Sequence, residues 1–285
     1  MRHRLAGVPA DDAYGWAVGS GGLVLVVADG VGSVAGSGEA AQTAVRVASV
    51  AGAEALGCSA TGSGGSERAT GSGASEHSTG SGASERSMGG LDADSEPPAF
   101  EPSGSEPPAS EPSGSEPPPS GLDAAELDRA DLDAAVRRAV VAVGEALRDG
   151  PGATTLVVAA VALDGRGRVA RVGDSTALVL GAGEWRELFS EADPDGGSMS
   201  TLTGALPAAR PEVELADLLI GPGEALVLVT DGIGDPLRDG PGTVAPALGA
   251  ALASAPTPLG LAWVVDFSRQ GCHDDRTVLA LWKGA

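Results

Sequence analysis

Short apolar blocks predict a series of β-strands along this sequence. The blocks end at Gly, Asp-Gly or other turn residues, which is typical of strands. The predicted strands are residues 13–18, 23–28, 154–163, 168–172, 176–183, 185–188, 224–230 and 277–282. Two of them contain fully apolar runs, at residues 23–28 and 225–229, so we expect both of their faces to be covered. The close spacing of the middle strands favours antiparallel pairing.

Two longer segments have the periodicity of amphipathic helices. Residues 37–56 place Ala41, Val45 and Ala48 on one face, with Ser37 as the predicted N-cap. Residues 122–150 form a second such helix that is predicted to end just before Gly150. Its apolar face consists of Leu132, Ala135, Val136, Ala139, Val140 and Val143. A further helix is predicted within 256–271, and the predominance of strands indicates a β-rich layered domain without regular βαβ alternation.

Residues 58–121 form a low-complexity insertion between the two long helices. The sequence first repeats TGSGGSERA, TGSGASEHS and TGSGASERS, and then SEPPAFEPSG, SEPPASEPSG and SEPPPSG. Neither block has enough apolar surface to offset the entropy of ordering, or the buried positions that a solenoid needs. Because loop-closure free energy grows slowly with length, we predict a disordered insertion in a single domain of residues 1–57 and 122–285.

Charge and cysteine content exclude several classes of protein. The formal net charge of −21 argues against nucleic acid as a partner, since phosphate backbones bind Lys and Arg. The two cysteines form no disulfide framework, so a reducing compartment is expected. No apolar run has the length of a membrane span, and the N-terminus lacks the apolar core of a signal peptide. We therefore expect a cytoplasmic protein without a membrane partner, and a monomer.

Acidic residues recur where apolar strands end or begin. They are Asp29, Asp174 and Asp231 after strands, and Asp11, Asp12, Asp274 and Asp275 before strands. Converging carboxylates would repel one another unless a cation lay between them, and oxygen ligands suit Mg²⁺ or Mn²⁺ rather than zinc. The histidines and cysteines have no zinc-site spacing. The alternative is that each acid only closes a turn, because a single Asp-Gly pair is more often a turn than a ligand.

Six segments of the sequence, five of which carry the strand-end acids, form an ordered set: GVPADDAYGWAV, VVADGVGSVAGSGEAAQTAV, GATTLVVAAV, GRVARVGDSTALVL, LVLVTDGIGD and DDRTVLALW. Together they resemble, in order, the motifs of the metal-dependent, type 2C protein serine/threonine phosphatases. The first resembles the opening motif of a bacterial subgroup. The others resemble the first metal-binding motif, the Gly-x-Thr-Thr, Val-Gly-Asp-Ser and Ser/Thr-Asp-Gly motifs, and the closing strand. The resemblance covers the whole chain outside the insertion.

The resemblance implies an α+β fold, a four-layer α-β-β-α sandwich in which helix pairs flank two antiparallel sheets. It also implies hydrolysis of phosphoserine and phosphothreonine in proteins. In that mechanism a water that bridges two Mn²⁺ or Mg²⁺ ions attacks the phosphorus, and no phosphoenzyme forms. The implied partner is a phosphorylated protein, such as a substrate of a Ser/Thr kinase pathway.

The motif positions imply roles for individual residues at a two-ion site. Asp29 would bridge both ions, and the carbonyl of Gly30 would assist at one of them. Asp231 and Asp274 would hold the other ion. These residues supply only oxygen ligands, which agrees with Mn²⁺ or Mg²⁺ as the cofactor.

Further acids match weaker or neighbouring positions of the family. Asp174, together with Asp231 and Asp235, matches a third and weaker ion site. Asp12 matches the opening-motif aspartate that orients the attacking water. Asp11 stands where many members of the family carry Glu or Gln, and it is included among the metal ligands.

Two departures from the family pattern favour a rival interpretation. Val31 stands where some members carry a histidine that is a candidate general acid. Gly7 stands where the phosphate-binding arginine usually lies, so His3 or Arg4 nearby would have to replace it, and Arg4 is the predicted phosphate contact. The rival is a pseudophosphatase, catalytically weak or inactive, that binds a phosphoprotein or regulates a partner.

Overall fold

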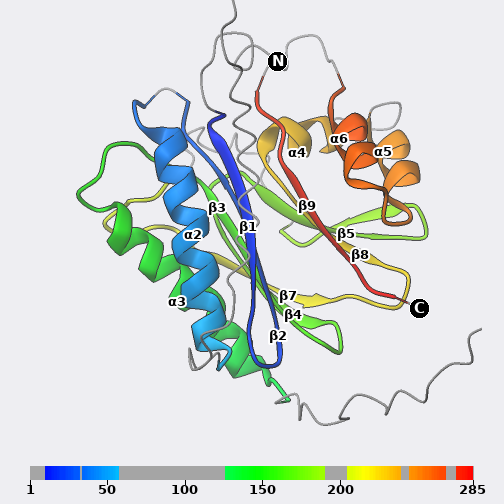
Figure 1. Ribbon diagram of the computed structural model, residues 1–285, viewed down its shortest axis with the longest axis horizontal. Coiled ribbons are helices and arrows are strands. Elements are labelled where there is room, and N and C mark those ends of the chain that lie inside the picture. Colours follow the sequence, from blue (N-terminus) through cyan, green and yellow to red (C-terminus); the bar gives the residue numbers. More distant parts are fainter. Residues whose placement is uncertain are drawn as a thin grey trace, which may run out of the picture. The chain divides into compact units, whose positions relative to one another are not determined.

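Two antiparallel β-sheets form the centre of the fold (Figure 1). This computed structural model describes residues 10–32, 34–57, 126–189, 204–238, 244–267 and 274–284. The described residues all belong to one compact unit, and the predicted insertion and Arg4 lie outside them. None of the helices in these ranges is both long and apolar enough to cross a membrane.

The strand order is β1-β2-β3-β4-β7 in the first sheet and β6-β5-β8-β9 in the second. The first sheet consists of β1 (Asp12–Val18), β2 (Gly22–Asp29), β3 (Leu156–Ala162), β4 (Arg166–Val172) and β7 (Glu214–Leu219). The second consists of β5 (Thr176–Gly181), β6 (Glu184–Glu187), β8 (Ala225–Val229) and β9 (Val278–Trp282). Every neighbouring pair is antiparallel, so the predicted pairing is confirmed.

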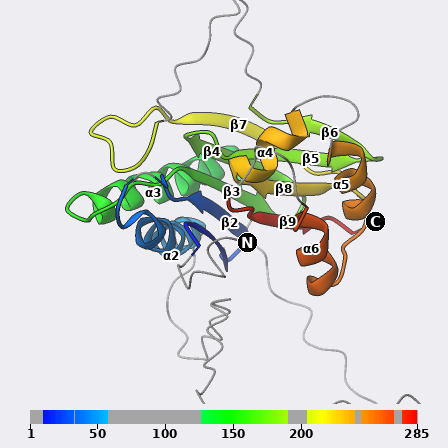
Figure 2. The same cartoon turned by 90° about the horizontal axis from the view of Figure 1, so that it is seen from above.

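Helices cover the outer face of each sheet (Figure 2). The first sheet is covered by α2 (Ser37–Ala55) and α3 (Arg129–Leu147). The second is covered by α4 (Asp231–Arg238), α5 (Val244–Leu252) and α6 (Pro258–Val265). The layers therefore follow the order α-β-β-α, and the predicted four-layer α+β sandwich is confirmed. The second helical layer has three helices in the described residues rather than the expected pair.

Three apolar clusters fill the spaces between the four layers. The cluster between the long helices and the first sheet contains the predicted faces of both helices. Those faces are Ala41, Val45 and Ala48 on α2, and Leu132, Ala135, Val136, Ala139, Val140 and Val143 on α3. The central cluster lies between the two sheets. Strands β2 and β3 are apolar along almost their whole length because they contribute side chains to both of these clusters.

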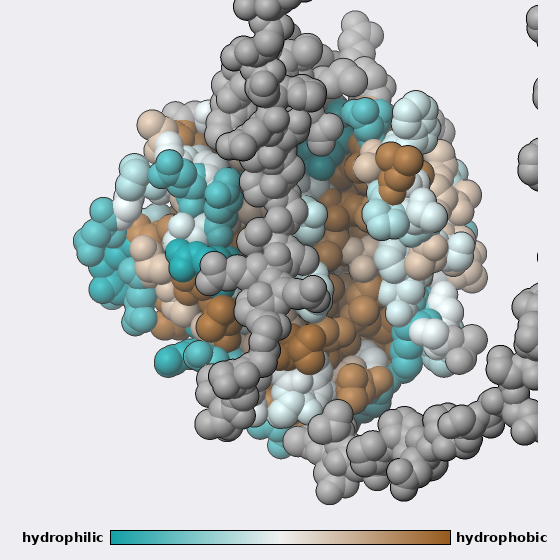
Figure 3. All heavy atoms as spheres, in the orientation of Figure 1, coloured by the Kyte–Doolittle hydropathy of each residue, from teal (hydrophilic) through white to brown (hydrophobic). Residues whose placement is uncertain are grey.

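Apolar side chains also reach the surface along the edge strands β1 and β9, and hydrophobic residues gather on this face of the described residues on the side of β9 (Figure 3). Tyr14, Trp16 and Val18, which share one face of β1, are more than half exposed. Leu279 and Leu281 of β9 are partly exposed and pack against the cluster between the sheets. The apolar layer between the sheets therefore extends to this side of the described fold.

The turn between β1 and β2 lies against both helix ends that border the insertion. A Cβ added to Gly19 would lie 2.7 Å from Cβ of Leu56, which directly follows α2. A Cβ added to Gly22 would lie 3.2 Å from Cδ1 of Leu127, which shortly precedes α3. The chain therefore leaves α2 and returns toward α3 beside one turn, at the end of β2 opposite Asp29.

The ends of the two long helices differ from the prediction. The N-cap of α2 is Gly36, with a φ of 85° in the left-handed region that glycine tolerates, and Ser37 is already helical. The predicted Ser37 cap is therefore wrong. Helix α3 ends at Leu147 with Arg148 as its cap, so Gly150 lies further beyond the helix than predicted. The N–H of Gly150 still donates to the carbonyl of Leu147, at 3.1 Å.

Two elements, β7 and α4, carry weak signals in the sequence. The strand β7 lies at the edge of its sheet, and its residues are only partly buried, so they lack a clear apolar block. The helix α4 contains two glycines and a proline, which disfavour helix formation. Burial of Ile233 in the outer apolar cluster stabilises this helix through tertiary packing instead.

Candidate metal centre

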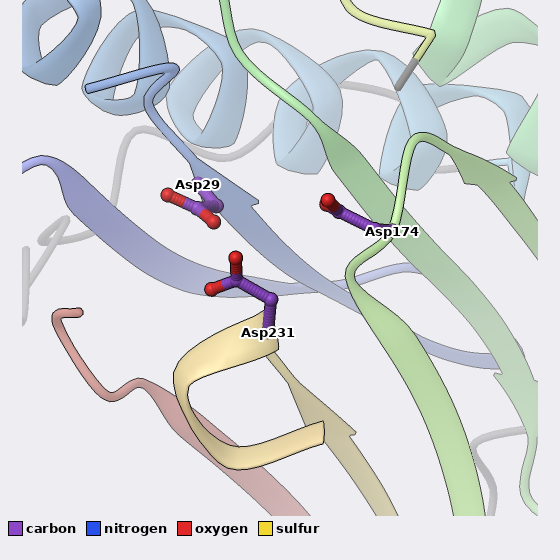
Figure 4. A group of neighbouring side chains, drawn as sticks. All are labelled: Asp29, Asp174 and Asp231. Atoms are coloured by element: carbon purple, nitrogen blue, oxygen red, sulfur yellow. The ribbon is translucent and has the colours of Figure 1, made fainter. Parts of the chain in front are cut away.

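Three carboxylates converge at one end of the two sheets (Figure 4). Asp29 is the last residue of β2, Asp174 lies between β4 and β5, and Asp231 begins α4 just after β8. One carboxylate oxygen of each residue lies within 4.8 Å of those of the other two. Segments that are far apart in the sequence therefore bring three acids to one point.

The backbone around Asp29 is held by donors from the segment that leads into β3. The carbonyl of Asp29 accepts from the N–H of Thr155 and from Oγ1 of Thr154, both at 2.8 Å. The next residue, Gly30, donates its N–H to the carbonyl of Asp11 at 3.0 Å. A Cβ added to Gly30 would lie 2.7 Å from the carbonyl oxygens of Asp11 and Ser37, so only glycine fits there.

Asp12 lies beside Asp29 and is tied to the second sheet. The two acids are register partners on β1 and β2. Oγ1 of Thr230 donates to Oδ2 of Asp12 at 2.9 Å and accepts from the N–H of Thr277 at 3.1 Å. Because Thr230 is fully buried, this hydroxyl fixes the direction of the Asp12 carboxyl without competition from water.

Asp11 is held through its backbone by an acid from the end of the chain. Its N–H donates to Oδ2 of Asp275 at 3.0 Å. The carbonyl of Asp275 packs closely on α4, because a Cβ added to Gly232 would lie 2.1 Å from it. The opening and closing motifs of the sequence therefore meet beside the three converging carboxylates.

Burial and mutual repulsion raise the pKa of the central carboxyls. At Asp29 burial is the largest cause, and the charges of Asp12, Asp231 and Asp174 add to it, so its pKa rises to about 10. Burial, followed by the charges of Asp174 and Asp274, raises the pKa of Asp231 to about 6. Burial also raises the pKa of Asp12, although its hydrogen bonds oppose the shift. A nearby cation would favour the charged forms of all these groups.

Asp174 has the environment expected of a ligand. Its Oδ1 is buried and has no hydrogen-bond partner in the described residues. Buried acceptors are almost always paired with protein, water or ligand, and three converging carboxylates match the preference of Mg²⁺ and Mn²⁺ for oxygen. The side chains at this point therefore fit a hard divalent cation.

Other predicted site residues lie around this group. Asp274 is exposed and acts on Asp231 through its charge. The side chain of Asp235 is 65% exposed, and its Oδ1 lies 3.3 Å from Nη1 of Arg238. Neither acid is a member of the group of three. Arg4, the predicted phosphate contact, lies outside the described residues, so its role stays a prediction.

Sequence reasoning did not single out the hydroxyl residues that hold these acids. Thr230 directly precedes Asp231 and fixes Asp12, while the hydroxyl of Thr154 donates to the backbone carbonyl of Asp29. A usable signal was present, because Thr is an unusual choice at the buried end of an apolar strand. Its partner could not be read from the sequence, since Thr230 and Asp12 are 218 residues apart.

The family of this chain follows from a comparison of its sequence. A sequence model described as protein phosphatase 2C matches residues 1–77 and 120–258, which is more than half of the 285 residues. The chain belongs to the protein phosphatase 2C family. The resemblance of its motifs is therefore confirmed. No protein with a curated description matches this member of the family in sequence.

Solved bacterial phosphatases share the fold of this phosphatase 2C family member. The S. agalactiae serine/threonine phosphatase has a TM-score of 0.54 at 15% identity, covering 96% of this chain and 93% of that chain. MsPP from Mycobacterium smegmatis, solved with cacodylate, has a TM-score of 0.53 at 18% identity, covering 96% and 92%. The catalytic domain of PstP, solved with two manganese ions, has a TM-score of 0.50 at 16% identity, covering 95% and 90%.

Proposed function

We propose that this chain is a Mn²⁺- or Mg²⁺-dependent phosphatase that hydrolyses phosphoserine and phosphothreonine in proteins. The observation that carries the proposal is the convergence of Asp29, Asp174 and Asp231 within 4.8 Å in a member of the protein phosphatase 2C family. The buried, unpaired Oδ1 of Asp174 supports it. A module that only binds partners has little need to bury acids together, because their repulsion destabilises the fold.

We assign two divalent ions to this end of the sheets, and a third, weaker ion beside them. The proposed ligands are Asp29, Gly30, Asp231 and Asp274 for the two ions, with Asp11 nearby, and Asp174, Asp231 and Asp235 for the third. When bound, such ions lower the pKa of water and neutralise charge on phosphoryl oxygens. In the absence of a cation the raised pKa keeps Asp29 protonated, so ion binding must release that proton.

Asp12 is proposed to orient the attacking water. Thr230 fixes Oδ2 of Asp12 from one side, and the Asp12 side chain hydrogen-bonds to Asp29 on the other. The carboxyl therefore stays next to the ion site while its direction is set by a buried donor. Val31, two residues after Asp29, offers no proton, so the leaving oxygen is proposed to take its proton from solvent.

The proposed substrate is a phosphorylated protein of a Ser/Thr kinase pathway in the cytoplasm. Arg4 is the proposed contact for the phosphate, since an arginine forks readily onto phosphate oxygens. We propose that the enzyme acts as a monomer, with no nucleic-acid or membrane partner.

Hydrolysis of p-nitrophenyl phosphate and of a phosphothreonine peptide, with Mn²⁺ or with EDTA, tests this function. Wild type should turn over both substrates only with Mn²⁺, and Asp29→Asn and Asp231→Asn should each lose about 100-fold or more. Asp149→Asn is the matched control, because Asp149 is exposed beyond the end of α3. Normal turnover in both site variants would overturn the assigned site.

Val31 and Gly7 favour the second candidate, a pseudophosphatase that binds phosphoproteins without hydrolysing them. This candidate predicts that wild type binds a phosphothreonine peptide but shows no metal-dependent turnover at any Mn²⁺ concentration. That result would overturn the enzyme proposal. Metal-dependent turnover in wild type would exclude the pseudophosphatase.

A further inference from the structure

Thr155 contacts the residues on both sides of Asp174 and also the backbone of Asp29. Its N–H donates to the carbonyl of Asp29 at 2.8 Å. Its Oγ1 lies 2.7 Å from Oγ of Ser175, the residue after Asp174. Its methyl carbon packs on Gly173, the residue before Asp174, because a Cβ added there would lie 2.7 Å from Cγ2 of Thr155. One residue therefore joins the end of β2, through its backbone N–H, to the turn that carries Asp174, through its side chain.

The hydroxyl pair of Thr155 and Ser175 links the two sheets at their acidic end. Thr155 leads into β3 of the first sheet, and Ser175 leads into β5 of the second. The two residues are 4% and 0% exposed. In a buried site a hydrogen bond is strong, and its loss leaves the remaining hydroxyl unsatisfied. The pair therefore resists a change in the spacing of the sheets at this point.

The Asp174 side chain depends on this support. Its Oδ1 has no hydrogen-bond partner among the described residues, so no donor from the protein fixes that oxygen. The position of the carboxyl then follows from its neighbours Gly173 and Ser175, which the Thr155 side chain contacts through its methyl group and its hydroxyl. Asp29 is held by the same residue.

We propose that Thr155 and Ser175 are positioning residues that set the spacing between Asp29 and Asp174, and thereby the affinity of this end of the sheets for a divalent ion. The inference rests on the proposed function, because it takes these acids to be metal ligands. Partners behind a ligand typically change metal affinity by about 10- to 100-fold when they are removed. Here the support acts through the residues that flank Asp174 and through the backbone of Asp29.

Calorimetric titration of the metal-free protein with MnCl₂ tests the proposal. Thr155→Val keeps the shape of the side chain and removes the hydroxyl, and we expect it to weaken Mn²⁺ binding about 10-fold or more. Thr176→Val is the matched control, because Thr176 is 1% exposed and its Oγ1 has no hydrogen-bond partner in the described residues. Its Mn²⁺ affinity should equal that of wild type.

A double-mutant cycle separates positioning from a general loss of stability. Ser175→Ala should also weaken Mn²⁺ binding, and the double variant should bind no more weakly than Thr155→Val, since a single hydrogen bond is lost. A merely structural role would lower the urea midpoint of the metal-free protein and leave the Mn²⁺ affinity of the folded protein unchanged. If Thr155→Val fails to fold, Ser175→Ala provides the same test.

The outcomes distinguish this inference from the proposed function. Weaker Mn²⁺ binding in Thr155→Val and Ser175→Ala, with normal binding in Thr176→Val, supports the positioning role. Unchanged Mn²⁺ affinity in both site variants overturns it and leaves the proposed function intact. If wild type binds no Mn²⁺, the proposed function fails and the inference fails with it.

Discussion

Asp12 and Asp29 lie directly opposite each other on the antiparallel strands β1 and β2, so two carboxyl groups share one end of the first sheet. After burial, the charge of Asp12 is the largest contribution to the raised pKa of Asp29. Two buried acids in this relation do not both ionise unless a cation compensates them. In the metal-free protein Asp29 therefore stays protonated at neutral pH, and folding includes the free-energy cost of keeping that proton.

Replacing Asp12 by Asn should make the metal-free protein more stable and less active. The amide carbonyl can still accept from Thr230, while the charge that opposes ionisation of Asp29 is gone. We expect a higher urea midpoint in EDTA at neutral pH, and a loss of Mn²⁺-dependent turnover of about 100-fold, as for removal of a water-orienting group. A lower urea midpoint would contradict the repulsion between the two acids.

The metal-free protein should lose stability as pH rises through the neutral range. The folded-state pKa of Asp29 is about 10, whereas an Asp in an unfolded chain titrates near about 3.9. Between these values the folded chain holds a proton that the unfolded chain has released, so the free energy of unfolding falls with pH. Asp231, with a pKa of about 6, adds to the fall in the acidic part of this range.

Urea unfolding in EDTA at about pH 5, 7 and 9 measures this slope. Mn²⁺ should stabilise the protein most at the highest pH, because cation and proton compete for the same carboxylates. At 100 times its dissociation constant, a ligand of the folded state adds about 2.7 kcal/mol. A free energy of unfolding that rises with pH in EDTA would show that these acids are ionised in the metal-free fold.

Thr230→Val should destabilise the protein without a change in side-chain volume. The substitution removes the donor to Asp12 and leaves the N–H of Thr277 without its side-chain acceptor. An unsatisfied buried group costs about 1–3 kcal/mol, and we expect a loss of that size in the free energy of unfolding. Thr176→Val should stay near wild type, because the Thr176 hydroxyl has no hydrogen-bond partner among the described residues. Equal effects of the two substitutions would argue against a special role of Thr230.

Gly30→Ala should damage both stability and activity. The added methyl would lie 2.7 Å from two carbonyl oxygens, so the chain next to Asp29 has to move. Overpacking of this kind costs about 1–3 kcal/mol. Gly144→Ala in α3 is the contrasting variant, because its methyl would meet only Cδ2 of Leu206, at 3.9 Å. It should stabilise the helix by about 0.5–1 kcal/mol, and thermal unfolding of both variants would compare the two sites.

Local patterns in the sequence were enough to predict a β-rich layered domain and to single out the acids, whereas the four-layer order was implied by the family resemblance. The helix faces followed from a 3.6-residue period, and Asp29 and Asp231 stood out because each ends an apolar block. The same patterns could not predict which hydroxyls support these acids. Thr155 and Ser175 are 20 residues apart, in different sheets, and their pairing depends on the packing of those sheets. The Ser37 cap failed for a similar reason, since backbone geometry at Gly36 decided it.

The turn between β1 and β2 lies where the insertion leaves and rejoins the fold, so the length of the insertion is independent of the acidic end of the sheets. The chain leaves after Leu56 and comes back at Leu127 beside this one turn, at the far end of β2 from Asp29. Repeats can therefore be gained or lost between these points without moving any strand that carries an acid.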